Sequence, residues 1–321
     1  MIATVTLNPS LDRTMTVNAL VSDDTNRALA IRSDPGGKGI NVSRVVRELG
    51  GRTLALGLLG GHNGQLVHRA LEDEGITSAF NWIEGETREN LILHDLSTGE
   101  PYRINAPGPF VRPEEGDRIQ RKIAGWAERP DFIVFSGSVP PGLPKEIYRG
   151  LIEEARSKGL KTALDADGTA LAAGIEARPT LVKPNRYELE RFTGRTIEGE
   201  SAFLAAAEDV IKRGIEMVVV SDGPRAAYAM SATEAWIATP PAISPQSSVG
   251  AGDAMVAGIV HRLALGESLG EALLWGVAAG AGAAMTPGTE LCHLRDVSRL
   301  VERVKLRRVG ALAIGGTETR A

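Results

Sequence analysis

The feature that most constrains this chain is an alternation of short apolar runs with amphipathic helical patterns. Apolar runs typical of buried strands recur at residues 53–59, 132–135, 162–164, 180–182 and 217–220. Helical patterns lie between such runs, at residues 65–74, 147–158 and 202–213. Short apolar strands connected through helices form a mainly parallel sheet covered on both faces. We therefore predict an α/β fold whose ligands bind beyond the carboxyl ends of the strands.

Two segments, residues 12–35 and 87–106, break this rhythm because apolar and polar residues alternate in them. The expected strands lie at residues 14–17, 27–31, 90–94 and 102–104, with a hairpin-type turn at residues 97–99. We predict that these insertions build a small, half-exposed β lid on a main domain of residues 1–11, 36–86 and 107–321. An exposed edge and apolar face on this lid would be covered by pairing, which predicts a homodimer.

Composition and charge narrow the class of protein. The 321 residues include 36 Lys plus Arg and 40 Asp plus Glu, a formal net charge of −4, and 43% are hydrophobic. This mildly acidic balance without a basic block argues against nucleic acid or a membrane surface as a partner. No signal peptide is evident, and the small residues at 272–289 suit packing in a protein core better than lipid. The single cysteine, Cys292, excludes an intrachain disulfide, so we expect a buried thiol and a cytoplasmic location.

The sharpest chemical signal is VGAGD at residues 249–253, which precedes an apolar helical pattern. Two glycines before a helix allow successive backbone N–H groups to point at one spot, where the helix dipole adds positive potential. An anion beside Gly250, Ala251 and Gly252 would be stabilised without a side chain. Asp253 is then placed to accept a proton from a neighbouring hydroxyl. An N-cap aspartate after a glycine turn has the same pattern, and the motif alone favours that simpler interpretation.

A second signal is KPNRYE at residues 183–188, directly after an expected strand, where Pro184 marks the start of a helix. Asn185 and Glu188 are three positions apart and share one face of the first turn. An amide oxygen and a carboxylate on one face can hold a hydrated Mg²⁺, which keeps several waters. Taken alone, the motif favours an ordinary helix N-terminus with its usual acidic residue.

The third signal, DPGGKGIN at residues 34–41, leads into a helix with one apolar face. Its paired glycines permit close approach of the backbone to a ligand, and Lys38 offers a point charge for a phosphate. The spacing differs from that of a Walker A motif, so we reject a P-loop. Asp12, after the first expected strand, is placed to accept hydrogen bonds from sugar hydroxyls, although a lone aspartate there is usually a turn residue.

Together these motifs resemble the PfkB (ribokinase-like) carbohydrate kinases, and specifically their phosphofructokinase branch. The resemblance covers almost the whole chain and rests on motifs in a fixed order: TLNPSLD (6–12), PGGKGIN (35–41), ETREN (86–90), SGSVPPG (136–142), KPNRYE (183–188), VSDGP (220–224) and VGAGD (249–253). Each motif is weak alone, but their joint occurrence is specific. The family fold is a three-layer α/β sandwich with a β lid, in agreement with the fold predicted above.

The resemblance implies catalytic and nucleotide-binding roles. Asp253 would be the catalytic base, and the amides of Gly250, Ala251 and Gly252 would form the anion hole for the transferred phosphoryl. Asn185 and Glu188 would organise Mg²⁺ through water. The residues expected to line the ATP site are Lys183, Asn185, Ser221 and Gly223.

The resemblance also implies a phosphosugar site. Asp12, Gly37 and Asn41 match sugar-hydroxyl contacts, whereas Lys38, Arg88 and Ser138 would hold the phosphate of the substrate. Arg88 suits this task because a guanidinium can bind phosphate oxygens in a bidentate manner. Asp165, which follows a strand near the expected metal, is a weaker candidate.

The implied reaction is transfer of the γ-phosphoryl of ATP to a phosphosugar hydroxyl, in which positioning and electrostatics dominate. ETREN and GTELC (288–292) look most like 6-phosphofructokinases, which convert fructose 6-phosphate to fructose 1,6-bisphosphate. Lys38 and DTNR (24–27) look closer to 1-phosphofructokinases and tagatose-6-phosphate kinases, because the 6-phosphofructokinase pattern has glycine at position 38. We expect fructose 6-phosphate as the substrate, with fructose 1-phosphate and tagatose 6-phosphate as alternatives.

More remote alternatives fit the residues less well. A nucleoside kinase would have surplus cations at Lys38 and Arg88. A non-catalytic sugar-phosphate sensor would be expected to lack the base or the metal motif, and both are present. A Rossmann oxidoreductase would need a third glycine that the 249–253 motif lacks.

Overall fold

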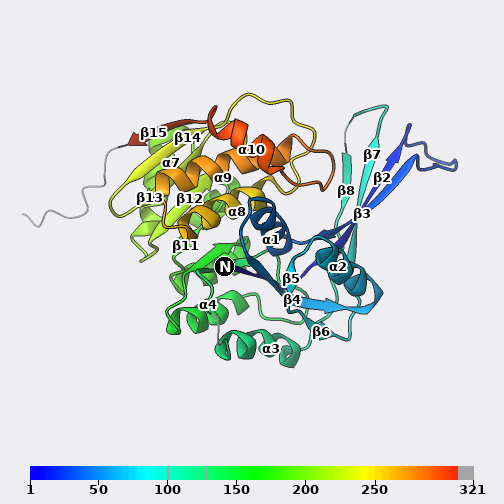
Figure 1. Ribbon diagram of the computed structural model, residues 1–321, viewed down its shortest axis with the longest axis horizontal. Helices are drawn as coiled ribbons and strands as arrows, with labels where there is room; N and C mark the ends of the chain where they lie inside the picture. The colour runs from blue at the N-terminus through cyan, green and yellow to red at the C-terminus, as the bar shows by residue number, and fades with distance from the viewer. Residues whose placement is uncertain (100, 127–128, 310–321) are drawn as a thin grey trace, which may run out of the picture.

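The main sheet forms the centre of an α/β sandwich (Figure 1). The computed structural model describes residues 1–99, 101–126 and 129–309. Within these residues, the strand order is β15-β14-β13-β12-β11-β10-β9-β1-β4-β5, and β6 also pairs with β4. The strands from β12 to β5 are parallel, whereas β13, β14 and β15 extend the sheet antiparallel. Their bounds are β1 Ile2–Thr6, β4 Thr53–Gly60, β5 Thr77–Ser78, β6 Asn81–Ile83, β9 Phe132–Ser136, β10 Thr162–Asp165, β11 Leu181–Val182, β12 Met217–Ser221, β13 Ala227–Ser231, β14 Ala235–Thr239 and β15 Lys305–Val309.

Helices cover both faces of this sheet, which confirms the predicted doubly covered α/β architecture. One core contains side chains of α3 (Pro113–Ala124), α4 (Ile147–Ser157), α5 (Gly168–Glu176), α6 (Arg186–Thr193) and α7 (Gly199–Ile211). The other face carries α1 (Lys38–Glu48), α2 (Gly61–Asp73), α8 (Ala251–Ala264), α9 (Leu269–Ala284) and α10 (Leu294–Val301). Successive β9 residues face opposite cores: Phe132 and Val134 pack with α8 and α9, and Ile133 and Phe135 pack with the other core. This alternation explains why the strand is apolar throughout.

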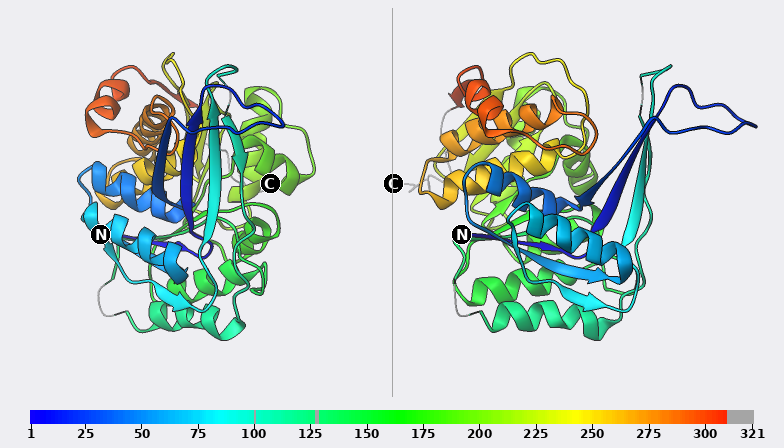
Figure 2. Two further views of the ribbon diagram at one scale, coloured as in Figure 1. Left: turned by 90° about the vertical axis from the view of Figure 1, so that its right-hand side faces the viewer. Right: turned by 45° about the vertical axis from the view of Figure 1, so that its right-hand side comes forward.

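A second, smaller sheet projects away from the sandwich (Figure 2). Its strand order is β3-β2-β7-β8, with bounds β2 Ser10–Val17, β3 Ala30–Gly36, β7 Arg88–Asp95 and β8 Pro101–Ile104. The predicted second β-sheet from two insertions is therefore confirmed, although β2 begins at Ser10 and β3 ends at Gly36. The division of the chain into domains at residues 12–35 and 87–106 stays a prediction.

Two local predictions were wrong. Residues 27–29 lie outside the strands, and β3 begins only at Ala30, because Asn26 exchanges hydrogen bonds with the backbone of Val21 and closes a local loop. The helix that follows the KPN segment of the KPNRYE motif begins later than expected. Asn185 is the N-cap and α6 starts at Arg186, so Pro184 precedes the helix rather than opening it.

Close packing of α8 and α9 explains the small residues of the C-terminal third. A Cβ added to Gly258 on α8 would lie 2.8 Å from the carbonyl oxygen of Trp275 and 2.9 Å from the Cα of Gly276 on α9. These helices thus approach through their backbones. Cys292 is buried in the same core, as predicted, and burial raises the pKa of its thiol to about 12. Within the described ranges, no helix has the length and apolar character needed to cross a membrane.

Candidate active site

The carboxyl ends of four neighbouring parallel strands bring most of the predicted residues to one edge of the sheet. Ser136 ends β9, Asp165 ends β10, Lys183 directly follows β11 and Ser221 ends β12. The backbone links these ends: the N–H of Lys183 donates to the carbonyl of Leu164 at 3.1 Å. The edge lies where ligands bind in open α/β sheets.

Asp253 lies in the first turn of α8, and its side chain is buried. Its Oδ2 accepts a 2.8 Å hydrogen bond from the Nδ2 of Asn41 on α1. Burial, together with the charge of Asp165, raises the pKa of Asp253 to about 6, against the opposing effects of Lys38, Asn41 and Lys183. A carboxyl with this pKa is mostly ionised near neutral pH and is more basic than an ordinary aspartate, which suits it to accept a proton.

The loop before α8 has the geometry of an anion site. Gly250 is the N-cap of α8 with φ +74, and a Cβ at this position would lie 2.5 Å from the Cδ2 of Leu291. Glycine is therefore required here for both backbone conformation and space. No side chain caps this described helix start, so the N–H groups of Ala251 and Gly252 keep their hydrogen-bonding capacity. The positive end of the helix dipole adds to their attraction for an anion.

Asp165 joins two lysines at the centre of the site. Its Oδ1 lies 3.2 Å from the Nζ of Lys38 and 3.6 Å from the Nζ of Lys183. Burial alone would raise the pKa of the Asp165 carboxyl, but the two ammonium groups outweigh this effect and hold the pKa below its ordinary value. The carboxylate is thus ionised in the interior. Asp165, the weaker candidate in the sequence, occupies the middle of the cluster.

Asn185 and Glu188 form a reciprocal capping box at the start of α6. The side chain of Asn185 accepts from the N–H of Glu188 at 2.9 Å, and Oε2 of Glu188 accepts from the N–H of Asn185 at 2.8 Å. The turn is therefore an ordinary capped helix N-terminus. It also brings Asn185 and Glu188 together in the first turn, as the sequence predicted. Oε1 of Glu188 lies 3.9 Å from the Nζ of Lys38, and burial raises the pKa of the carboxyl.

This turn fits a hydrated divalent cation. One carboxylate oxygen of Glu188 and the second lone pair of the Asn185 amide oxygen remain outside the capping bonds. Hard oxygen donors of this kind suit Mg²⁺ when water completes its coordination shell. Because the described residues contain no group of three or more His, Cys, Asp or Glu able to hold a metal, an all-protein cage is not formed there.

The predicted nucleotide residues lie beside this turn. Asn185 and Ser221 form a parallel β-bridge, and the N–H of Ser221 donates to the carbonyl of Pro184 at 3.2 Å. Gly223 follows with φ +55, and a Cβ there would meet no atom within 4 Å. The space around Gly223 is thus open, which is compatible with a ligand near its backbone.

Asp12 lies in the lid sheet, level with Asp34 of β3 and Asn90 of β7. Its Oδ1 accepts from the Oγ of Ser10 at 2.6 Å and from the Nδ2 of Asn90 at 2.8 Å. A Cβ on Gly36 would lie 2.3 Å from its Oδ2, so this glycine makes room for the carboxylate. Burial raises the pKa of Asp12 against these hydrogen bonds.

Asn8 forms hydrogen bonds with both Arg88 and Ser138 and so links these two predicted phosphate contacts. The guanidinium of Arg88 donates to the carbonyl oxygens of Asn8 and Ala106 at 2.9 and 2.8 Å, and burial lowers its pKa. The Nδ2 of Asn8 donates to the Oγ of Ser138 at 3.1 Å. Arg88 therefore also braces the base of the lid, a structural task beyond the phosphate contact expected from the sequence.

Lys38 was expected to act beside Arg88 and Ser138. Among the described residues, its ammonium instead contacts the carboxylates of Asp165 and Glu188. Gly37, before it, has φ +114 and contacts the first strand region, since a Cβ there would lie 2.8 Å from Cγ2 of Thr6. The remaining predicted sugar contact, Asn41, reaches Asp253.

Sequence reasoning gave no separate role to Asn8 and Asn90. Both lie inside the motifs TLNPSLD and ETREN, yet their importance arises from contacts distant in sequence. Asn8 donates to Ser138 in the loop after β9, and Asn90 donates to Asp12 on the neighbouring strand. The signal that could have found them is a buried amide that needs partners: Asn90 is buried within β7, and Asn8 is buried in the loop between β1 and β2.

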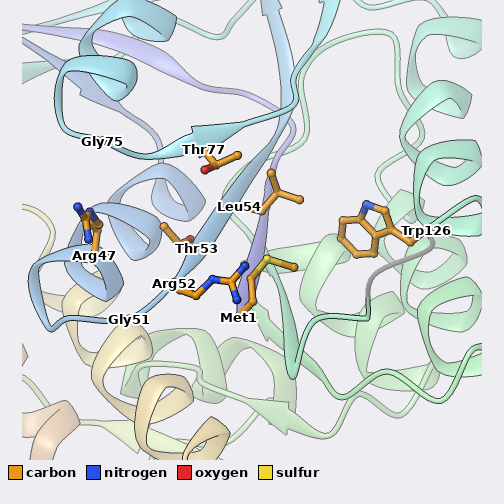
Figure 3. Close-up of a pocket in the computed structure, with 9 residues that line it drawn as sticks. All are labelled: Met1, Arg47, Gly51, Arg52, Thr53, Leu54, Gly75, Thr77 and Trp126. Carbon is orange, nitrogen blue, oxygen red and sulfur yellow. The ribbon is translucent and has the colours of Figure 1, made fainter.

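A separate cavity of about 520 Å³ lies away from this cluster (Figure 3). Its lining includes Arg52 and Thr53 at the start of β4, Thr77 at the start of β5, and Trp126. Because these are the amino ends of the strands, the cavity opens at the opposite edge of the sheet from Asp165. It therefore contributes nothing to the site.

Comparison with known proteins identifies the class. The model of the pfkB family carbohydrate kinases matches residues 5–296, so the chain belongs to this family and is a carbohydrate kinase, a phosphotransferase with a hydroxyl acceptor. The chain is 38% identical over 307 residues to the 1-phosphofructokinase of Rhodobacter capsulatus, covering 95% of this chain and 97% of that protein.

Two further comparisons place it in the phosphofructokinase branch of the family. It is 35% identical to the ATP-dependent 6-phosphofructokinase isozyme 2 of Escherichia coli, covering 93% of this chain and 97% of that protein. The phosphofructokinase-2 of Escherichia coli in complex with fructose-6-phosphate superposes with a TM-score of 0.88 at 33% identity, covering 94% and 98% of the two chains. The expected ribokinase-like α/β fold with a second small sheet is thereby confirmed.

Proposed function

We propose that this kinase transfers the γ-phosphoryl of ATP to a hydroxyl of a phosphosugar, in the first place fructose 6-phosphate. The observation that carries the proposal is the convergence of Asp253, the uncapped start of α8 and the Asn185–Glu188 turn at one sheet edge. A proton acceptor beside a preorganised anion site is what phosphoryl transfer to a hydroxyl requires. A sugar-phosphate sensor would have no need of this combination.

Each group has a distinct task in the proposed reaction. Asp253 accepts the proton of the attacking hydroxyl, while Asn41 fixes the orientation of its carboxylate. The N–H groups of Ala251 and Gly252 stabilise charge on the phosphoryl as it moves. Mg²⁺, held through water at Asn185 and Glu188, would neutralise charge on the ATP oxygens. Lys183, Ser221 and Gly223 line the ATP side of the site.

The phosphosugar side is assigned to the lid and the residues at its base. Asp12 accepts hydrogen bonds from sugar hydroxyls, and its partners Ser10 and Asn90 hold it in place. Arg88 and Ser138, joined through Asn8, bind the phosphate of the substrate. Closure of the lid would exclude water and so suppress hydrolysis of ATP.

Fructose 1-phosphate is the second candidate substrate. The relative from Rhodobacter capsulatus is a 1-phosphofructokinase, and the relative from Escherichia coli is a 6-phosphofructokinase, at similar identities of 38% and 35%. Lys38 favours the first group and the ETREN motif the second. Tagatose 6-phosphate is a third candidate substrate, because Lys38 also resembles the pattern of the tagatose-6-phosphate kinases.

We further propose a homodimer formed through the lid. Ile31, Tyr102 and Ile104, on the edge strands β3 and β8, are 58%, 47% and 61% exposed, an unusual density of large apolar groups for a small sheet. A second copy would cover them. The single cysteine keeps a reducing cytoplasm as our expected compartment.

The test is ADP release with Mg²⁺ and a panel of acceptors: fructose 6-phosphate, fructose 1-phosphate, tagatose 6-phosphate, fructose and adenosine. The ranking of kcat/KM names the substrate. A clear preference for one phosphosugar supports the proposal. Turnover of fructose or adenosine alone would overturn the assignment of Arg88, and no turnover of any acceptor would favour a sensor.

A further inference from the structure

Lys38 occupies an unexpected place for a residue predicted to bind the phosphate of the substrate. It opens α1, and its Nζ lies 3.2 Å from Oδ1 of Asp165 and 3.9 Å from Oε1 of Glu188. Its side chain is 37% exposed, whereas Lys183, on the other side of Asp165, is only 4% exposed. Lys38 is therefore the solvent-facing member of the pair.

The charge balance of the cluster shows what Lys38 contributes. Asp165, Glu188 and Asp253 bring three carboxylates, and Lys38 and Lys183 bring two ammonium groups, which leaves a net charge of −1 when all are ionised. Loss of the Lys38 charge makes the protein groups of this site more negative by one unit, whatever cation Glu188 holds. An anionic phosphoryl group arriving there would therefore be bound less favourably.

The first turn of α1 also connects this charge to the proton acceptor. Lys38 and Asn41 are three positions apart and share one face of the helix. Lys38 contacts Asp165 and Glu188, and Asn41 donates to Asp253. One helix turn thus holds the carboxylates from three other segments of the chain.

We propose that Lys38 is a positioning residue for phosphoryl transfer: it anchors Asp165 and supplies the positive charge that keeps the carboxylate cluster able to receive the phosphoryl group. This inference rests on the proposed kinase function and replaces the role of Lys38 as a primary contact of the sugar phosphate. The charged groups that face Asp253 are Asp165 from β10, Lys38 from α1 and Lys183 after β11.

The experiment compares Lys38→Met and Lys38→Arg with wild-type enzyme across pH. For Lys38→Met we expect kcat to fall roughly 10²–10³-fold, the cost of removing one group that stabilises a developing charge. KM for the phosphosugar should change less than about threefold, since Lys38 would not contact the substrate equally in the ground state and the transition state. The acidic limb of the kcat profile should move to higher pH, and Lys38→Arg should restore it. Lys158→Met, which removes a surface lysine of the same charge, is the matched control.

A rise in KM for the phosphosugar, with kcat and the acidic limb unchanged, would overturn the proposal in favour of a phosphate contact. A second measurement needs no turnover: the titration of Asp253 in protein labelled with ¹³C-aspartate. Its pKa should be higher in Lys38→Met than in wild type, and an equal pKa would contradict the proposal. Absence of phosphosugar turnover by the wild-type protein, by contrast, would reject the proposed kinase function and leave this titration result standing.

Discussion

Asn41 donates a hydrogen bond to the carboxylate of Asp253 at 2.8 Å, although 212 positions separate the two residues. The contact joins the first turn of α1 to the first turn of α8. It leaves the second carboxylate oxygen of Asp253 outside this bond. The geometry thus orients a buried acid while preserving one oxygen for a proton.

The elevated pKa of Asp253 predicts that its ionised carboxylate, although needed for activity, lowers the stability of the folded protein at high pH. Because its folded pKa of about 6 exceeds the ordinary 3.8, Asp253 contributes stability that is fully present below pH 3.8 and is lost as the pH rises through about 6. Asp253→Asn should therefore raise the free energy of unfolding at pH 8 by about 1–3 kcal/mol. Denaturant unfolding at pH 8 and pH 4 checks this. Equal stability of the two proteins at pH 8 would contradict a strained buried carboxylate.

The same pKa predicts the acidic limb of the activity profile. Since the base must be ionised, kcat should fall tenfold per pH unit below about 6 and level off above it. Steady-state rates from pH 5 to 9 at saturating substrates measure the limb. A profile that is flat down to pH 5 would mean that Asp253 is not the group that accepts the proton.

Glu188→Gln should weaken the use of Mg²⁺ without loosening α6. Glutamine can still accept the capping bond from the N–H of Asn185, but it lacks the charge that attracts the cation. We expect the Mg²⁺ concentration for half-maximal activity to rise roughly 10-fold or more. Glu115→Gln is the matched control, because Glu115 caps α3 in the same manner far from the site. An equal effect of both substitutions would assign Glu188 to capping alone.

Arg88→Lys should separate the phosphate contact from the structural task. Lysine keeps the charge but cannot span the carbonyl oxygens of Asn8 and Ala106, so we expect a stability loss of about 1–3 kcal/mol. KM for the phosphosugar should rise roughly 10-fold or more, while kcat/KM for unphosphorylated fructose changes little. A uniform loss with both acceptors would indicate that Arg88 only braces the lid.

Ile104→Lys should convert the proposed dimer to a monomer, because a charge would replace one of the large exposed apolar groups of the expected interface. Sedimentation at micromolar concentration measures the change. Leu265→Lys is a suitable control, since Leu265 is also 61% exposed but lies at the end of α8. A wild-type monomer, or a dimer that survives Ile104→Lys, would contradict pairing through the lid.

Most of the fold could be predicted because its strands are apolar on both faces and its helices have one apolar face. The apolar run of β9, which packs into both cores, can be recognised from a few consecutive residues. The same is true of the glycine loop before α8. Residues 27–29 lie outside the strands, next to a loop in which Asn26 accepts from the N–H of Val21 and donates to its carbonyl oxygen. The alternation of residue types does not reveal such a loop.

The residues that belong to the candidate site could be predicted from the sequence more readily than the contacts between their side chains. The motifs identified Asp253, Asn185 and Glu188, which depend on position within a helix turn. The contacts of Lys38 with Asp165 join residues 127 positions apart, and no local pattern fixes which carboxylate a flexible lysine reaches. Chain topology decides such pairings.

The most direct test of the central claim is transfer of labelled γ-phosphate from ATP to fructose 6-phosphate by wild-type protein and by Asp253→Asn. The account predicts a labelled bisphosphate with the wild type and a rate lower by roughly 10²–10⁴ with the variant. If no label reaches this sugar, fructose 1-phosphate or tagatose 6-phosphate, or if Asp253→Asn transfers label as fast as the wild type, the account is wrong.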